Sequence, residues 1–339
     1  MTASNTMAVS KLEVVGRAGT VALRKVRIVR RHSEASDVCS LDLVADDGRA
    51  LPPFAAGSHV DVHLGSGLVR QYSLCSDPAD VSTYQLAVLK ESVSRGGSVA
   101  MHELAVGAGL VISEPRNLFP LALGATSSLL IAGGIGITPL LAMAHTLHSR
   151  QAAFELHYCA RTPARAAFAE RLRTSQFADR VVFHFDDGAE AQRWRSDAVI
   201  RAPLPGQHLY VCGPAGFIDH VLQTARAAGW PDESMHCERF VAAAVAARTS
   251  PDDPFEVEIA STGLVVRVGA KETIVEALSA HGVDIPTSCE QGVCGTCVIK
   301  VLKGTPDHRD DYLNAAERAE QQMTPCCSRA KSPRLVLDL

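Results

Sequence analysis

The chain has 339 residues, a mass of 36.1 kDa and a formal net charge of −4 at pH 7. This length allows two or three domains, and the slight acidic excess argues against nucleic acid as a partner, because no basic surplus neutralises phosphates. The N-terminal residues lack the apolar segment of an export signal, and the longest apolar run, Leu129–Ala144, is too short and too rich in glycine to span a bilayer. We therefore expect a cytoplasmic protein without membrane contact, whose ten cysteines are reduced and partly metal-bound.

The first domain is predicted over residues 21–120, after a flexible tail over residues 1–20. Short segments of alternating polarity recur there with turn signals between them, as in Val21–Arg31, His59–Leu64, Tyr84–Leu89 and Leu110–Ser113. One helix is expected near Ser98–Leu104. Strands at this spacing without intervening helices are typical of an antiparallel β-barrel.

The second domain is predicted over residues 121–240, where strands and helices alternate. The expected strands are Leu129–Ala132, Phe154–Cys159, Val181–Phe185 and Leu209–Cys212. The expected helices are Pro139–Ser149, Ala166–Thr174, a short one near Trp194, and Ala215–Ala228. This alternation indicates a parallel sheet with right-handed crossovers, the pattern of dinucleotide-binding domains.

A low-complexity, proline-containing stretch predicts a linker over residues 241–253. The third domain is predicted over residues 254–339. It contains a hairpin, a helix, a cysteine-rich loop and two further strands, in the order Phe255–Ala260, Leu264–Val268, Thr273–His281, Cys297–Leu302 and Leu335–Leu339.

The cysteines of the third domain carry the strongest signal in the chain. Cys289, Cys294 and Cys297 have the spacing C-x4-C-x2-C, with Cys326 and Cys327 further on. This is the pattern of plant-type [2Fe–2S] clusters. The competing interpretations are a zinc site, which prefers paired C-x2-C units, and thiols without a ligand.

The segment Pro286–Cys297, together with Cys326–Ala330 and Leu335–Leu339, resembles the ferredoxin domain of the phthalate dioxygenase reductase family, which includes vanillate demethylase reductases. The resemblance covers residues 21–339 in the same domain order. It implies a multidomain α+β and α/β protein with a flavin-binding antiparallel β-barrel, a parallel-sheet nucleotide-binding domain and a β-grasp-like ferredoxin domain. It also implies that Cys326, two residues before Ser328, is the fourth cluster ligand, and that Cys327 is a buried free thiol.

In the barrel, Arg70-Gln71-Tyr72-Ser73 resembles the Arg-x-Tyr-Ser flavin motif of the wider ferredoxin–NAD(P) reductase superfamily. An arginine suits a phosphate, a tyrosine offers an aromatic face, and Ser73 offers a small donor at the redox-active edge of the flavin. A glycine-rich helix start with Gly96, Gly97 and Ser98 follows, and backbone amides there favour phosphate. The resemblance implies FMN. The alternative for Arg70, Tyr72 and Ser73 is that they form an ordinary solvated face of a barrel strand.

Two glycine-rich turns in the second domain resemble the superfamily's nicotinamide site. Gly133-Gly134-Ile135-Gly136-Ile137-Thr138-Pro139 follows a buried strand and opens a helix, and Cys212-Gly213-Pro214 ends a later strand. The resemblance places Cys212 beside the nicotinamide, and it makes Phe240 a shield of the flavin. The alternatives are that the glycine-rich turn is purely structural, that Cys212 is a small buried thiol and that Phe240 is a core aromatic residue.

The dinucleotide is expected to be NADH, and this choice depends on the resemblance. Arg161 and Arg165 follow the second strand of this domain, where they either attract the 2′-phosphate of NADPH or are simply solvated. Asp186 and Asp187 follow the third strand and either contact a ribose or face solvent.

The predicted function is that of an NADH-dependent reductase that passes single electrons through FMN and a [2Fe–2S] cluster to a Rieske-type oxygenase of aromatic catabolism. NADH delivers two electrons together and the cluster accepts one at a time. The protein therefore has to position the cofactors and tune their reduction potentials. Two alternatives stay open. One is a reductase for another acceptor, such as a diiron hydroxylase, and the other is a non-enzymatic metal-binding redox sensor.

Overall fold

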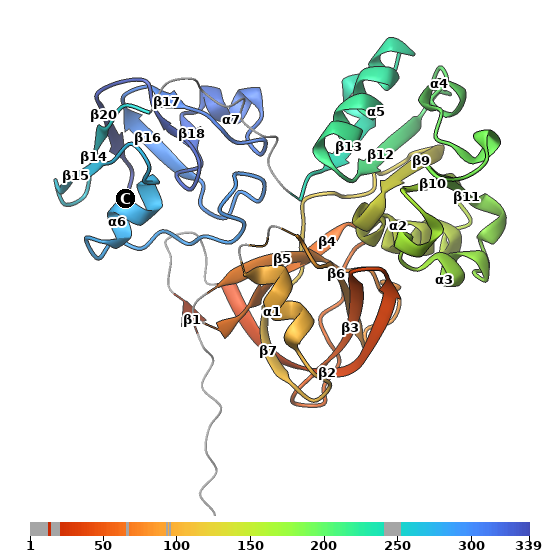
Figure 1. Ribbon diagram of the computed structural model, residues 1–339. Helices are drawn as coiled ribbons and strands as arrows, with labels where there is room; N and C mark the ends of the chain where they lie inside the picture. The colour runs from red at the N-terminus through yellow and green to blue at the C-terminus, as the bar shows by residue number, and fades with distance from the viewer. Residues whose placement is uncertain (1–12, 15–20, 66–67, 93, 95, 241–251) are drawn as a thin grey trace, which may run out of the picture.

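A computed structural model describes residues 13–14, 21–65, 68–92, 94, 96–240 and 252–339. Apart from residues 13–14 and 252–253, the predicted tail and linker therefore lie outside the described residues. Figure 1 shows three bodies, formed by a barrel, an open sheet covered with helices, and a small C-terminal domain. In the described residues, no helix combines the length and the apolar character that crossing a membrane requires.

The first body is an antiparallel barrel. Its strands β2 (Val21–Ala35), β3 (Val38–Ala45), β4 (Ser58–His63), β5 (Val69–Ser73), β6 (Tyr84–Leu89) and β7 (Gly109–Ser113) pair in the order β5-β4-β7-β2-β3-β6, and α1 spans Gly97–Glu103. A bridge between Leu74 and Leu86 joins the two ends of this order. Two minor strands, β1 (Glu13–Val14) and β8 (Arg116–Asn117), pair with β2 and β4. The predicted antiparallel barrel is confirmed.

The second body is a five-stranded parallel sheet. Its elements are β9 (Ser127–Gly133), α2 (Ile137–Ser149), β10 (Ala153–Ala160), α3 (Ala169–Arg173), β11 (Val181–Phe185), α4 (Ser196–Val199), β12 (Gln207–Cys212), α5 (Ala215–Ala227) and β13 (Met235–Glu238). Short 3-10 helices span Gly134–Gly136, Pro163–Arg165, Ala178–Arg180, Glu190–Gln192 and Asp232–Ser234. The helix expected near Trp194 is α4, which begins two residues after it.

The strand order of this sheet is β11-β10-β9-β12-β13, with every pair parallel. Successive crossovers therefore run in one direction from β9 to β11 and in the other from β12 to β13. The carboxyl ends of β9 and β12 flank the point where this direction reverses. In open α/β sheets, ligands bind in the crevice at such a point.

The third body carries the cysteine-rich loop. Its elements are β14 (Phe255–Ile259), β15 (Val265–Val268), α6 (Ile274–Ser279), β16 (Ile299–Lys303), β17 (Pro306–Asp307), α7 (Ala315–Ala319), β18 (Gln322–Met323), β19 (Arg329–Ala330) and β20 (Arg334–Leu337). The main sheet has the order β15-β14-β20-β16-β18, in which only β14 and β20 are parallel. A capping box between Thr273 and Glu276 starts α6, because it satisfies two backbone amides that the helix leaves free.

The buried apolar side chains divide the chain differently from the three bodies. One cluster runs from the barrel into the parallel sheet, for example from Ile112 to Leu130 and Leu141, whereas the third body has a cluster of its own around Val257 and Leu335. The other face of the parallel sheet packs on α5 in a third cluster. The barrel and the sheet are therefore expected to unfold together, and the C-terminal body separately.

We expect Leu335→Ala to destabilise the C-terminal body alone. Leu335 is fully buried on β20, and truncation of a buried leucine costs about 2–5 kcal/mol. The control is Leu302→Ala on β16, where the side chain is 47% exposed and the expected change is within about 0.5 kcal/mol. Thermal unfolding followed by visible absorbance and by tryptophan fluorescence would test this. A barrel and sheet transition that falls as far as the C-terminal one would contradict separate cores.

Candidate active site

A cavity of about 390 Å³ lies where the three bodies meet. Residues of all three bodies line it, namely His59, Arg70, Gln71, Ser73, Leu118, Cys237, Glu238, Arg239, Phe240, Cys289, Gln291, Val293, Asp311, Tyr312, Asn314 and Glu317. Five of the residues singled out from the sequence are among them: Arg70, Gln71, Ser73, Phe240 and Cys289. The predicted flavin motif, the end of the parallel sheet and one cluster cysteine therefore face the same space.

Arg70 connects the cavity with the glycine-rich start of α1. A Cβ on Gly97 would lie 2.6 Å from Cγ of Arg70, so the arginine packs directly over this glycine. Gly96 has a φ of 91°, which favours glycine, and Ser98 Oγ accepts a hydrogen bond from the Glu91 backbone N–H at 3.1 Å. The guanidinium and the glycine turn together offer the donors that a phosphate needs.

Tyr72 is not among the cavity-lining residues. Its half-buried ring packs on the apolar core, and burial raises the pKa of its hydroxyl. His59 lies on β4 opposite Ser73 and contacts Gln71 at 3.2 Å. Burial, with the nearby Arg116, lowers the pKa of His59 to about 4, so this ring is neutral at pH 7 and can act as an acceptor for Gln71.

Ser73 meets a carboxyl group that sequence reasoning missed. Its Oγ donates a hydrogen bond to Oε2 of Glu238, at 3.2 Å, across the junction of barrel and sheet. Surrounding protein withdraws this carboxyl from bulk water and raises the pKa of Glu238 to about 8. The carboxyl therefore holds a proton at neutral pH. The sequence offered only one signal, an acidic residue at the end of β13, three residues before the predicted linker.

The two glycine-rich turns of the parallel sheet pack against each other at the point where the strand order reverses. A Cβ on Gly136 would overlap the carbonyl of Cys212, and a Cβ on Gly213 would lie 3.0 Å from Cα of Gly133. Only glycines allow this approach, so the backbones of both turns lie within reach of one bound group.

Other residues predicted in these turns are buried beneath the turn backbone and stabilise it. Thr138 Oγ1 donates to the carbonyl of Ile135 at 3.0 Å, and Pro139 is buried in the first turn of α2. Cys212 is completely buried, and burial raises the pKa of its thiol far above the usual range. None of these residues, nor Gly134 and Pro214, is among those that line the large cavity.

The candidate 2′-position combines both kinds of charge. Arg161 and Arg165 are exposed, as are Asp186 and Asp187. The backbone N–H of Asp187 donates to the carbonyl of Arg161 at 3.3 Å, so the arginine and the two acids share one edge of the sheet. Basic and acidic side chains therefore lie together where β10 and β11 end.

The four predicted cluster cysteines converge in the third body. Cys289, Cys294, Cys297 and Cys326 are each less than 9% exposed. The sulfur of Cys289 lies within hydrogen-bond reach of Cys294 and Cys326, and the sulfur of Cys326 also reaches Cys297. In the described parts of the chain, no three histidine, cysteine, aspartate or glutamate side chains surround a point suited to a single metal ion.

The loop around these thiols supplies backbone donors. The N–H of Gln291 points at the sulfur of Cys289 at 3.4 Å, and the N–H of Thr296 points at that of Cys294 at 3.5 Å. Gly292 and Gly295 have φ values of 74° and 69°, and a side chain at Gly295 would overlap Tyr312. Amide donors near cluster sulfurs help to set the reduction potential, so this tight loop fits a cluster.

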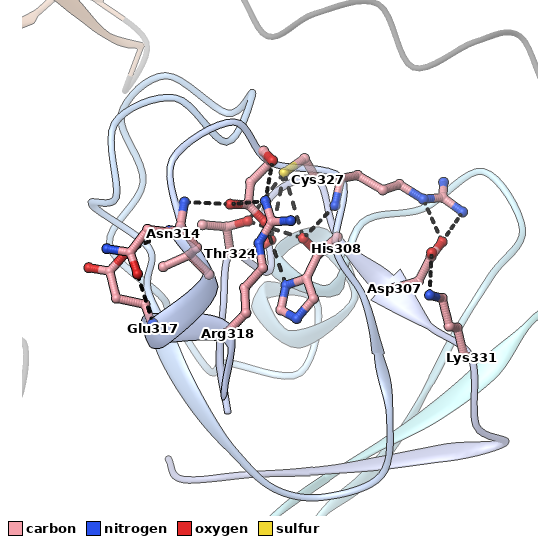
Figure 2. A network of polar contacts seen from close by, with 12 residues as sticks. Asp307, His308, Asn314, Glu317, Arg318, Thr324, Cys327 and Lys331 are labelled. Atoms are coloured by element: carbon pink, nitrogen blue, oxygen red, sulfur yellow. Dashed lines mark hydrogen bonds and ion pairs between the residues drawn. The ribbon is translucent and has the colours of Figure 1, made fainter. Parts of the chain in front are cut away.

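Cys327 lies beside Cys326, with the two sulfurs within hydrogen-bond reach of each other, and a Cβ on Gly292 of the cluster loop would overlap the Cys327 sulfur. Figure 2 shows it in a network of polar contacts beside Thr324, whose Oγ1 lies 3.4 Å from its sulfur. Cys327 is half-buried and also approaches Ser328 Oγ at 3.9 Å. Cys326 reaches Cys289 and Cys297 in addition to Cys327. This geometry supports Cys326 as the fourth ligand.

Two protein-family models match the chain. A model described as "2Fe-2S iron-sulfur cluster binding domain" matches residues 257–331. A second, described as "Dimethylamine monooxygenase subunit DmmA-like, N-terminal domain", matches residues 114–235. The first covers all five cysteines of the C-terminal body, and the second covers both glycine-rich turns.

The chain is 56% identical over 308 residues to a vanillate O-demethylase oxidoreductase from Pseudomonas sp. (strain HR199 / DSM 7063), covering 90% of this chain and 96% of the relative. It is 42% identical to a heme-dependent oxidative N-demethylase beta subunit from Ectopseudomonas mendocina (strain ymp), covering 85% and 90%. The solved structure of phthalate dioxygenase reductase, titled as a modular structure for electron transfer from pyridine nucleotides to [2Fe–2S], superposes with a TM-score of 0.74 and 37% identity, covering 94% and 98%.

The chain belongs to the phthalate dioxygenase reductase family. It is an oxidoreductase with a flavin reductase fold and a C-terminal [2Fe–2S] domain, and it serves as the reductase of an oxygenase system. The family resemblance and the fold predicted from the sequence are thus confirmed.

The geometry of the two adjacent cysteines leads to a paired prediction. We expect Cys326→Ala to lose the [2Fe–2S] electron paramagnetic resonance signal, because Cys326 faces Cys289 and Cys297, while reduction of the flavin by NADH survives. Cys327→Val should keep the signal, since this thiol faces Thr324. A normal signal in Cys326→Ala together with a lost signal in Cys327→Val would reverse the assignment.

Glu238 should make stability depend on pH. Its pKa is about 8 in the folded protein, against an ordinary value of 4.5, so the folded state binds more protons between these values, and stability falls as pH rises from about 4.5 to 8. We expect Glu238→Gln to remove this decline, so that its melting temperature relative to wild type is higher at pH 8.5 than at pH 5. Glu190→Gln, at an exposed position, is the control. Equal differences at both pH values would exclude a raised pKa.

Proposed function

We propose that the chain takes a hydride from NADH onto FMN and passes single electrons through the [2Fe–2S] cluster to a Rieske-type oxygenase. The observation that carries this proposal is the shared cavity, in which Ser73 of the barrel, Phe240 after the parallel sheet and Cys289 of the cluster loop face one space. Two carriers held at such a junction can exchange electrons with no further component between them. The proposed domains are residues 21–120, 121–240 and 254–339.

Residues of the cavity, of strand β5 and of the turn before α1 have distinct proposed tasks toward the flavin. When bound, FMN accepts the two electrons of a hydride together and releases them one at a time. Arg70, with the turn at Gly96, Gly97 and Ser98, is proposed to hold its phosphate. Gln71, which lines the cavity, and the half-buried Tyr72 beside it would flank the ring system. Ser73 positions a hydroxyl at its redox edge, and Glu238 stores a proton beside that hydroxyl, at 3.2 Å.

The nicotinamide is proposed to lie over the carboxyl ends of β9 and β12. Gly133, Gly134 and Gly136 would face the pyrophosphate of the dinucleotide, because these glycines allow close backbone approach. Thr138 and Pro139 would hold this turn at the start of α2. Cys212, Gly213 and Pro214 form the opposite wall, with the Cys212 thiol kept neutral by burial. Phe240 lines the cavity next to Glu238 and is proposed to cover the flavin until the nicotinamide stacks on it.

The cluster is proposed to bind Cys289, Cys294, Cys297 and Cys326, and to deliver its electron to the oxygenase. A Rieske-type acceptor is favoured by the relatives named for vanillate O-demethylation and phthalate dioxygenation. One relative, 42% identical, is a subunit of a heme-dependent N-demethylase, which makes a heme protein the second candidate acceptor.

The cofactor content and the choice of dinucleotide test the proposal together. We expect about one FMN and two irons per chain, and a kcat/KM for NADH well above that for NADPH with a one-electron acceptor such as cytochrome c. Arg161→Ala provides the control, and it should leave the NADH value unchanged because NADH carries no 2′-phosphate for this exposed arginine to contact. FAD in place of FMN, zinc in place of iron, or a preference for NADPH that Arg161→Ala abolishes would each overturn the corresponding part.

A further inference from the structure

We propose that Asp61 is a positioning residue for electron transfer, because it holds the cluster loop on the flavin barrel through the hydroxyl of Ser288. This inference depends on the proposed function, since it concerns the step between the flavin and the cluster. In that step one electron leaves the reduced flavin and one iron of the oxidised cluster accepts it. Asp61 touches neither carrier and acts through the chain segment that carries Cys289.

Asp61 is a buried carboxylate with partners from two bodies. It is 5% exposed and lies on β4, in the wall of the barrel. Its Oδ2 accepts from Nη2 of Arg116 at 2.7 Å, and its Oδ1 accepts from Oγ of Ser288 at 2.8 Å. Its backbone N–H donates to Oγ of Ser113 at 2.9 Å. The barrel thus fixes the carboxylate and leaves one oxygen for the cluster loop.

Ser288 sits directly before a predicted cluster ligand. It is 2% exposed, and the next residue, Cys289, lines the shared cavity. Asp61 pairs with Gln71 on β5, two residues from Ser73, which lines the same cavity. One hydrogen bond therefore joins the strand pair that carries the predicted flavin residues to the residue adjoining a cluster sulfur. A change in this bond moves the two sites relative to each other.

A second polar contact across the same junction is weaker. Nη1 of Arg70 lies 3.6 Å from Oε2 of Glu290, whose side chain is 48% exposed. The Arg70 side chain is 14% exposed, but at 3.6 Å this ion pair is long, and water and salt reach Glu290 and screen it. A buried hydrogen bond to a charged acceptor is stronger, and its loss leaves the acceptor without water to replace the donor. We therefore assign the positioning of Cys289 to Asp61 and Ser288.

The strength of this bond sets the expected effect of its removal. Loss of a hydrogen bond to a charged group lowers the equilibrium constant for docking of the cluster loop about tenfold. Misplacement of reacting groups by a small distance also slows transfer, since rates depend steeply on geometry. Because the apolar core of the C-terminal body is separate from that of the barrel and sheet, loss of docking need not unfold either part.

The test uses the full-length holoprotein and four variants of the pair. Ser288→Ala removes the hydroxyl alone, Asp61→Ala removes the acceptor, and the double variant removes both. Ser288→Thr restores a hydroxyl. The matched control is Asp42→Ala on β3, whose carboxylate is 3% exposed and accepts from Arg30 and Gln85, each at 2.7 Å and each in the barrel.

After rapid mixing with NADH, flavin bleaching should keep its wild-type rate in every variant. Reduction of the cluster should be slowed about tenfold in Ser288→Ala and Asp61→Ala, no further in the double variant, and hardly at all in Ser288→Thr and Asp42→Ala. A readout independent of turnover is amide hydrogen exchange in residues 284–297 of the oxidised protein. Exchange there should increase in Ser288→Ala and stay unchanged in Asp42→Ala.

Unchanged cluster reduction and unchanged exchange in Ser288→Ala would overturn the proposal. Slower cluster reduction that a shifted cluster reduction potential explains in full, with normal amide hydrogen exchange, would also overturn it. In that case the Ser288 hydroxyl would tune the potential of the cluster and not its position. If Asp61→Ala does not fold, Ser288→Ala decides alone. A wild-type protein without flavin, or with a cluster that NADH does not reduce, would instead refute the proposed function.

Discussion

The apolar core that runs without interruption from the barrel into the parallel sheet fixes the geometry of the site. Ile112 of the barrel and Leu130 of the sheet belong to the same buried cluster, so the two bodies cannot move apart without exposing apolar surface to water. This continuity holds the end of β5 against the end of β13. Ser73 and Glu238 consequently meet at 3.2 Å, although 165 residues separate them in the sequence.

The C-terminal body meets the other two differently. It has its own apolar cluster around Val257 and Leu335, and the contacts to the barrel described above are polar. A polar junction dissociates at lower cost than an apolar one, because water can replace its hydrogen bonds. The fold thus combines a rigid unit for hydride transfer with a separately folded electron carrier, which must also meet an oxygenase.

Burial explains why the ionisable groups of the site differ from their surface counterparts. Withdrawal from water keeps Glu238 protonated near neutral pH, His59 neutral, and the Cys212 thiol uncharged. Asp61 differs from these groups because its buried carboxylate is paired with Arg116 and accepts a hydrogen bond from the hydroxyl of Ser288.

The sequence by itself determined the motifs and the architecture. The spacing of Cys289, Cys294 and Cys297 and the change from period-two segments to alternating strands and helices are local patterns, and local patterns can be read along a linear chain. Some observed strand boundaries differ from the predicted ones by a few residues, because the extent of pairing with a neighbour, and not local propensity, decides where a strand ends. Strand β2 extends to Ala35, beyond the predicted Arg31, and its hairpin with β3 was not predicted.

Only the tertiary structure decided which motifs meet. Glu238 and Asp61 are ordinary acidic residues in the sequence, and their roles arise from partners at Ser73 and Ser288 that lie far away along the chain. Likewise, the different surroundings of Cys326 and Cys327 follow from the loop that faces each sulfur. Burial and long-range contacts depend on the packed whole, so no local pattern encodes them.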